Sequence, residues 1–258
     1  HVPIIFGPQN LKADVVVKGE YEVGMQDQAP LGPESGLEIP ADDGGIDLYL
    51  STQWLHVDRG QLATVLGLPP EKVRLTLAGI GGAFGAREDM SMQAHIALLA
   101  MRTGKPVKIV YSREESFFGH VHRHPGKLRY EHGVTKEGKL VYVKANIVLD
   151  GGAYASSSPA VCANAACFAV GPYEVESATI DAYVAYTNNP PCGAMRGFGA
   201  VQTGFAYESQ MDKIAETLGM DPIALRLKNA MVRDSLMHTG QPVDSAATVA
   251  EILETLRD

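Results

Sequence analysis

The chain has 258 residues, of which 45% are hydrophobic and 20% are charged. This composition is that of an ordinary folded protein, and the length suffices for one large domain or two modest ones. Thirty acidic residues against 22 Lys and Arg give a formal net charge of −8. That balance argues against nucleic acid or an anionic membrane surface as the main partner, because both attract clustered cations. No apolar run approaches the roughly 18 residues that are needed to cross a bilayer.

The first part of the chain is predicted to be β-structure followed by a helix. Residues 13–23 are rich in Val and form one expected strand. Residues 37–40 and 46–50 flank an Asp-Asp-Gly-Gly turn, which predicts a hairpin. Asp58 is a suitable N-cap for a helix that ends at Gly67.

The next elements alternate between strand and helix. Residues 72–77 alternate as a strand and lead into the glycine-rich stretch 79–85. Residues 88–102 carry apolar side chains at helical spacing, and Gly104 closes that helix. Residues 107–111 form another short expected strand.

The second half is predicted to begin with a long hairpin over 128–149. Residues 151–172, rich in Ala and Ser, are expected to be irregular, and 180–186 to form a strand. Helices are predicted at 200–218, from the Asp-Pro pair at 221–222, and at 248–256. Because most strand neighbours look like hairpins, the predicted fold class is α+β, with mixed, mainly antiparallel sheets and packed helices. The sequence shows no internal domain boundary.

Two groups of potential metal ligands are predicted to have no such role. Cys162, Cys167 and Cys192 are too few for a disulfide framework or an iron–sulfur cluster, so we expect reduced, buried thiols. The segment 120–124 carries three alternate histidines, but no acidic residue or Cys lies near them in sequence. A surface strand is therefore favoured there over a metal site.

Two loops stand out as candidate binding sites. Residues 79–88 and 192–200 each follow a strand, carry clustered glycines and lead into a helix. Glycines let the backbone approach a ligand, and a helix N-terminus offers unpaired N–H groups to anionic oxygens. Each loop also carries one Phe, which offers a flat apolar surface, and one Arg, which can bind an anionic group. The first loop does not match the dinucleotide-binding motif, because Phe84 stands where the third Gly is required. Tight structural turns and a general anion or nucleotide binder remain alternatives.

The motifs at 82–85, 194–199 and 219–229 occur in one order and register. They resemble the molybdenum-binding, catalytic subunit of the xanthine dehydrogenase/aldehyde oxidase family of molybdenum hydroxylases. The resemblance covers nearly the whole chain, and the run at 26–34 is most similar to bacterial xanthine dehydrogenase subunits. It implies that 1–258 is part of the molybdenum-pterin-binding region.

The resemblance also implies roles for single residues. Gln53 matches the residue that hydrogen-bonds an oxo ligand of molybdenum, and Arg196 one that holds the same centre. Phe198 matches the ring that stacks on an aromatic substrate, and Glu88 the carboxylate that hydrogen-bonds a purine. The expected cofactor-binding residues are Gly82, Ala83, Phe84, Gly85, Arg196, Gly197 and Gln202.

The implied activity is oxidative hydroxylation of a purine, another N-heterocycle or an aldehyde, with water as the oxygen source. The implied cofactor is molybdenum–molybdopterin, with the metal held through the pterin dithiolene and not by protein ligands. Iron–sulfur clusters and FAD are expected on other domains or subunits of an oligomeric, cytoplasmic enzyme of purine catabolism. The family's general-base Glu lies beyond the second loop and has no counterpart before Asp258. The chain is therefore expected to be a middle fragment that is inactive alone.

The substrate indications disagree. Glu88 favours a purine, whereas the Arg of xanthine-using members has no counterpart near Ala155. A carbon monoxide dehydrogenase is disfavoured, because Gly197 stands where that branch has a Cys. The alternative of a different class is a non-catalytic scaffold or assembly domain that keeps the fold without the cofactor.

Overall fold

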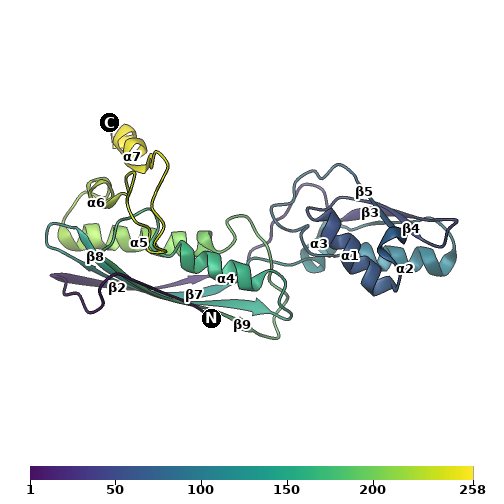
Figure 1. Cartoon of the computed structure of the whole chain (residues 1–258), viewed down its shortest axis with the longest axis horizontal. Coiled ribbons are helices and arrows are strands. Elements are labelled where there is room, and N and C mark those ends of the chain that lie inside the picture. The colour runs from purple at the N-terminus through teal and green to yellow at the C-terminus, as the bar shows by residue number, and fades with distance from the viewer. Residues whose placement is uncertain (258) are drawn as a thin grey trace.

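Two β-sheets organise the chain, and each lies in a lobe of its own (Figure 1). The structure is a computed structural model that describes residues 1–257. The fold is mixed α+β with mainly antiparallel pairing, as predicted; the parallel pairs are β4 with β5 and β8 with β9. Among the described residues, no helix has the length and apolar character to span a membrane.

The larger lobe contains a five-stranded sheet. In spatial order its strands are β1 (Val2–Phe6), β9 (Ser177–Tyr186), β8 (Leu140–Gly152), β7 (Gly126–Val134) and β2 (Val15–Val23). Strands β7 and β8 form the predicted long hairpin, with Leu128 opposite Ile147. Side chains of β8 alternate, so that Val143, Ile147 and Leu149 are buried on one face.

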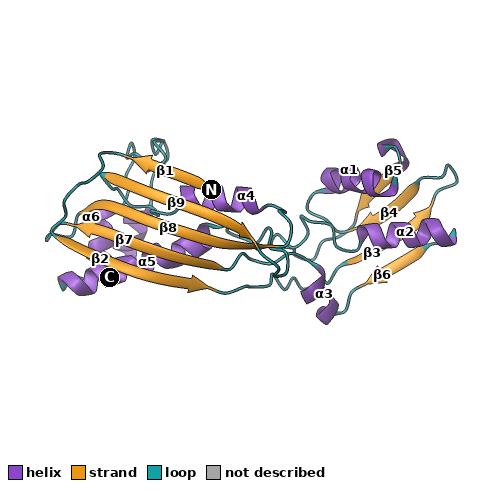
Figure 2. Cartoon of the chain, turned by 90° about the horizontal axis from the view of Figure 1, so that it is seen from below, coloured by secondary structure: helices purple, strands orange, loops and turns teal. Residues whose placement is uncertain are grey.

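Helices cover that apolar face, and Figure 2 shows them behind the strands. They are α4 (Ser158–Cys167), α5 (Ala200–Leu218) and α6 (Pro222–Asn229), and α7 (Val249–Arg257) follows near the C-terminus. Small residues of α4 and α5, among them Ala165 and Ala206, are fully buried in the core with Leu128 and Ile147. Their small side chains let the helices lie close to the sheet. None of the helices described within residues 1–257 lies on the opposite face of the sheet (Figure 2).

The smaller lobe contains a four-stranded sheet with its own core. Its strands, in spatial order, are β5 (Val73–Leu77), β4 (Ile46–Leu50), β3 (Ser35–Pro40) and β6 (Val107–Val110). Its helices are α1 (Leu55–Leu66), η1 (Pro70–Lys72), α2 (Gln93–Thr103) and α3 (Arg113–Gly119). Ile46, Leu48 and Leu50 of β4 pack with Leu62 of α1 and Ile96 of α2.

The chain passes between the lobes twice, through residues 24–34 and 120–125. Strand β2 ends at Val23 and β3 begins at Ser35, while α3 ends at Gly119 and β7 begins at Gly126. The junction of the lobes is therefore built mostly from irregular backbone, which is where binding residues are most often found.

Most predicted elements are present, and the differences have local causes. Helix α1 begins at Leu55, so Asp58 lies within its first turn instead of capping it. Helix α2 begins at Gln93, five residues later than predicted. The segment 151–172, predicted to be irregular, contains α4, because its Ala residues favour a helix and Pro159 fits the first turn. Strand β1 and helix α3 were not predicted.

One buried carboxyl lies in the core of the smaller lobe. Glu38 of β3 is opposite Leu48 in the register, so its side chain shares the apolar face under the helices. It is fully buried, and neither carboxylate oxygen has a hydrogen-bond partner. Burial raises the pKa of Glu38 from its ordinary 4.5 to about 7.

Because the pKa of Glu38 is raised, replacing it by a neutral residue should stabilise the fold, and the size of this effect should depend on pH. Between about pH 4.5 and 7 the folded chain keeps a proton that the unfolded chain releases, so stability falls as the pH rises through that window. At 1.36 kcal/mol per pH unit, the penalty reaches about 3 kcal/mol above pH 7. We expect Glu38→Gln to raise the free energy of unfolding by about 1–3 kcal/mol at pH 8 and by little at pH 4, as measured by urea denaturation. The exposed Glu71→Gln is the control, and equal effects at both pH values would contradict the assignment.

Candidate functional site

The two predicted loops meet at the junction of the lobes. The first loop (residues 78–92) joins β5 to α2, and the second (residues 187–199) joins β9 to α5. The backbone N–H of Arg196 donates to the Phe84 carbonyl at 2.9 Å. A Cβ atom on Gly85 would lie 2.5 Å from the Ala194 carbonyl oxygen. The loops are therefore in direct backbone contact, which only glycine permits at position 85.

Both loops hold a phenylalanine in the left-handed region. Phe84 has φ 55° and Phe198 has φ 48°, and glycines with positive φ follow each of them. A bulky residue in this region is unusual and costs of order 1–3 kcal/mol, so such positions occur mainly at functional sites. The side chain of Phe84 is 48% exposed. The strain keeps an aromatic ring at the surface of the loop instead of in the core.

A cavity of about 310 Å³ opens between the loops. The predicted site residues that line it are Gln53, Phe84, Gly85, Glu88, Arg196, Gly197 and Phe198. Ala194 and Met195 also line it and were not among the predicted site residues. The sequence could have indicated these two residues, because both lie inside the second glycine-rich loop. Of the other predicted residues, Ala83 is buried beneath the loop surface and Gly82 supplies a turn at φ 98°.

Gln53 is held in place by the first loop. Its Oε1 accepts the backbone N–H groups of Gly85 at 3.0 Å and Arg87 at 3.3 Å. Its own backbone N–H donates to the Arg87 carbonyl at 2.9 Å. Within residues 1–257, its side-chain NH₂ has no acceptor. The loop thus fixes the carbonyl end of the amide and leaves a positioned donor at the cavity.

The two loop arginines differ in their surroundings. Arg196 is exposed at the cavity, and its guanidinium makes no hydrogen bond or ion pair with any described residue. Arg87 is buried; its Nη1 donates to Ser51 Oγ at 2.8 Å and its Nη2 to the Gly32 carbonyl. The prediction that both arginines anchor a ligand is therefore wrong for Arg87, which holds the loop to the smaller lobe.

Glu88 and Gln202 also differ in location. Glu88 is half-buried at the cavity, and its pKa is raised first by burial and second by the negative charge of Asp89. Its carboxyl therefore keeps a proton to higher pH than an exposed one and can donate a hydrogen bond over a wider range. Gln202 is fully buried in α5 behind the second loop. Its Nε2 donates to the His124 carbonyl at 3.2 Å, so it braces the backbone that supports the cavity.

The histidine segment is not the predicted surface strand. His120, His122 and His124 are all at least 92% buried. Residues 120–125 cross between the lobes, and the chain brings Asp27 from 93 residues upstream against His120. The acidic partner missing from the local sequence is thus supplied by the other crossing segment.

The three cysteines are unpaired, as predicted, but Cys167 is only partly buried. Cys162 and Cys192 are buried, and burial raises the pKa of both thiols, that of Cys192 to about 12. These thiols stay protonated at neutral pH and are poor ligands for a metal.

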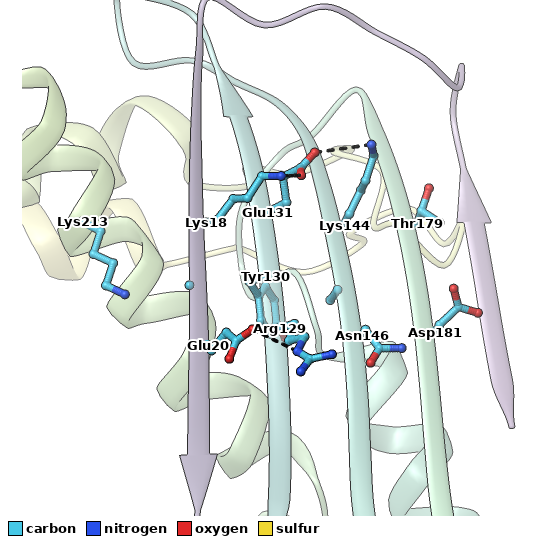
Figure 3. Close-up of a pocket in the computed structure, with 12 residues that line it drawn as sticks. Lys18, Glu20, Arg129, Tyr130, Glu131, Lys144, Asn146, Thr179, Asp181 and Lys213 are labelled. Carbon is cyan, nitrogen blue, oxygen red and sulfur yellow. Dashed lines mark ion pairs between the residues drawn. The ribbon is translucent and has the colours of Figure 1, made fainter.

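A larger hollow of about 560 Å³ lies on the helix-free face of the five-stranded sheet (Figure 3). Most of its charged side chains form ion pairs with one another. Glu131 lies 2.9 Å from Lys18 and 3.4 Å from Lys144, and Arg129 lies 3.1 Å from Glu20. These are exposed ion pairs on regular strands, which contribute little to stability or binding. The smaller cavity between the loops, with its unpartnered donors, is the better candidate site.

Comparison with known proteins places the chain among cofactor-binding domains. Residues 9–230 match the family model described as the molybdopterin cofactor-binding domain. The nicotinate dehydrogenase large molybdopterin subunit of Eubacterium barkeri is 41% identical over 247 residues, which are 96% of this chain and 58% of that protein. A probable xanthine dehydrogenase subunit of Bacillus subtilis is 38% identical over 240 residues, 92% of this chain and 32% of that protein.

Solved structures agree with this result. The aldehyde oxidoreductase of Desulfovibrio gigas superposes with a TM-score of 0.93 at 29% identity, over 99% of this chain and 28% of that one. This match confirms the predicted fold class. The chain spans 58% or less of the length of each of these three relatives. The resemblance inferred from the two loops is thereby confirmed, and the chain belongs to the molybdopterin cofactor-binding domain family, as found in molybdenum hydroxylases.

Proposed function

We propose that the junction of the lobes holds a molybdenum–pterin cofactor, and that the chain serves an enzyme that hydroxylates a purine, another N-heterocycle or an aldehyde. The observation that carries the proposal is the pair of joined glycine loops around the 310 Å³ cavity. When bound, the cofactor supplies a two-electron acceptor, while water supplies the oxygen that enters the substrate.

The residues present fit such a group. The cavity offers hydrogen-bond donors without protein acceptors, the Gln53 NH₂ and the Arg196 guanidinium, and an electron-rich oxygen or anionic group would satisfy both. Gly85 and Gly197 line the cavity with backbone atoms, which a flat ligand can contact directly. The buried cysteines provide no thiolate, which suits a metal held by the cofactor's own sulfurs.

The chain's own residues would then have distinct roles. Gln53 would donate to an oxygen ligand at a position fixed by Gly85 and Arg87. Phe198 would contact a planar substrate through its ring, and Phe84, which is 48% exposed, would lie beside the cofactor. Glu88 would hydrogen-bond the substrate ring, and its raised pKa extends the pH range over which it can donate to a ring nitrogen or carbonyl. Gln202 would support the second loop from behind.

Substrate and partners are part of the proposal. The relatives named above act on nicotinate, xanthine or aldehydes by their names. Glu88 supports a purine, whereas the absence of an arginine in residues 150–158 opposes xanthine. Iron–sulfur and FAD domains or subunits would carry the electrons onward, in an oligomeric cytoplasmic enzyme that also contains the rest of the catalytic subunit and its general base.

Arg196→Ala tests the proposal in the parent enzyme. We expect a loss of 10- to 100-fold in activity or in molybdenum and pterin content, because one charge-assisted hydrogen bond is worth about 1.5–3 kcal/mol. Molybdenum is measured by elemental analysis, oxidised pterin by fluorescence, and turnover with xanthine, nicotinate and benzaldehyde. Arg102→Ala, at the exposed end of α2, is the matched control. A well-folded parent enzyme without molybdenum or pterin would instead support a scaffold domain.

A further inference from the structure

A second cluster of metal-ligating side chains lies between the two crossing segments. Asp27 comes from the first segment, and His120 and His122 come from the second. Asp27 Oδ2 is 3.5 Å from His120 Nε2 and 3.2 Å from His122 Nε2, and one ligand atom from each residue lies within 4.8 Å of the others. None of the three lines the cavity between the glycine loops.

The cluster contains buried polar atoms without partners. The His120 side chain is fully buried; its Nδ1–H donates to the Val121 carbonyl at 3.1 Å, and Nε2 has no hydrogen bond. Asp27 Oδ1 accepts the Ala29 N–H at 2.6 Å, whereas Oδ2 has no hydrogen-bond partner. A ring nitrogen fixed by a backbone carbonyl on its other side is the usual arrangement of a metal-binding histidine.

His122 completes the set after a shift of one proton. Its Nε2 lies 2.8 Å from the Phe117 carbonyl oxygen and donates to it. Its Nδ1 is buried and has no partner. Moving the proton from Nε2 to Nδ1 frees Nε2 as a ligand. An ion bound there requires the Phe117 carbonyl oxygen to move back or to join the ion's coordination shell, and the Nδ1–H then needs an acceptor such as a water molecule.

The charges around the cluster are of both signs. Glu34 is 2% exposed, neither of its oxygens has a hydrogen bond, and it lies close enough for its charge to act on His120. The positive charge of Arg87 acts on both Glu34 and His120, so the two buried charges partly balance. Asp27 then remains as a second carboxylate facing two histidines, which suits a divalent ion.

We propose that Asp27, His120 and His122 bind a divalent transition-metal ion of the zinc type, separate from the cofactor site. Zinc–nitrogen and zinc–oxygen bonds of about 2.1 Å place neighbouring ligand atoms of a tetrahedral site about 3.4 Å apart. The two Asp27–His separations, 3.5 and 3.2 Å, already match this spacing. Imidazole and carboxylate together favour Zn²⁺ over Mg²⁺ or Ca²⁺.

The ion's role follows from what the two segments support. Gln28, next to Asp27, donates to the Ala194 carbonyl at 2.7 Å. Arg123, next to His122, donates to the Arg196 carbonyl at 3.0 Å. Both bonds end on the second glycine loop. An ion bound by both crossing segments would therefore fix them to each other directly behind that loop and stiffen it.

Co²⁺ titration of the untagged full chain tests the site. After removal of metals with a chelator, we expect one Co²⁺ per chain with the visible absorption of four-coordinate cobalt, displaced by one equivalent of Zn²⁺. His120→Ala and Asp27→Asn should each weaken binding at least about 100-fold, because even supporting residues of metal sites contribute 10- to 100-fold. Zn²⁺ should raise the melting temperature of the wild-type chain and not of Asp27→Asn.

The control is the double variant His56→Ala/His95→Ala, which removes two exposed histidines from α1 and α2. It should bind Co²⁺ as the wild type does. Asp27→Asn keeps the shape of the side chain, so it gives a result even where His120→Ala does not fold, as judged by circular dichroism. Absence of the cobalt spectrum in the wild type, or equal titrations of wild type and Asp27→Asn, would overturn the proposal. The pterin cofactor is not needed for this test, so its outcome is independent of the proposed function.

Discussion

Replacing Gln53 by glutamate should lower turnover of the parent enzyme about 100- to 1000-fold while leaving the first loop in place. A carboxylate oxygen can still accept the N–H groups of Gly85 and Arg87, which the Gln53 Oε1 accepts now. The other oxygen replaces the NH₂ at the cavity, so a donor becomes a negatively charged acceptor. Loss of a single positioned donor to a developing negative charge typically costs 10²–10³ in kcat.

The measurement separates the donor from the scaffold role of the side chain. Turnover is followed with xanthine, nicotinate and benzaldehyde, alongside the molybdenum content and the melting temperature. Gln53→Ala is the informative partner, because it also leaves the Gly85 and Arg87 N–H groups unpaired and should lower the melting temperature. Turnover of Gln53→Glu within twofold of the wild type, at equal molybdenum content, would exclude Gln53 from the site.

Local sequence patterns were sufficient to predict a helix or strand whose ends are marked by residues such as a terminal or turn glycine. Helix α5 spans Ala200–Leu218 as predicted, because Gly219 adopts φ 63° at its end and its apolar residues recur at helical spacing. Strands β7 and β8 follow from alternation around the Gly138 turn. Helix α3 carried an overlooked indication, since Ser112 and Glu115 form a capping box that the sequence displays.

Long-range relations could not be predicted from local patterns. The parallel pairing of β8 with β9 depends on the connection through α4. The Ser-rich residues at the start of α4 do not predict a helix, because packing against the sheet is what stabilises it. The amino-acid composition along the sequence does not indicate that the two sheets lie in separate lobes. Asp27 meets His120 across 93 residues of sequence, so no spacing rule would join them.

In the candidate site, too, local sequence patterns indicated some features, whereas others depend on the tertiary fold. Glycine clusters marked the two loops that the structure brings together at the cavity, because a loop that needs positive φ favours glycine at those positions. The orientation of each side chain is a tertiary property. Each loop carries one arginine, yet Arg87 turns inward to Ser51 and Gly32, whereas Arg196 lies at the cavity.

Gly85→Ala should destabilise the junction and release the cofactor. The new Cβ would lie 2.5 Å from the oxygen and 2.6 Å from the carbon of the Ala194 carbonyl, and 2.9 Å from the Met195 nitrogen. These are backbone atoms held by Gln28, so no flexible side chain can move aside. The residue also has φ 101°, which strains any L side chain. We expect the free energy of unfolding to fall by about 2–4 kcal/mol.

Gly79→Ala is the matched control, because it lies in the same loop, has an ordinary φ and would place its Cβ in open space. Its unfolding free energy in urea should stay within about 0.5 kcal/mol of the wild type. In the parent enzyme, Gly85→Ala should carry little molybdenum even at temperatures where it is folded, since the two loops can no longer touch. Because Phe84 and Arg196 are joined through this backbone contact, normal loading of Gly85→Ala would mean that the cofactor does not need both loops together, and the proposed site would have to be redrawn around one of them.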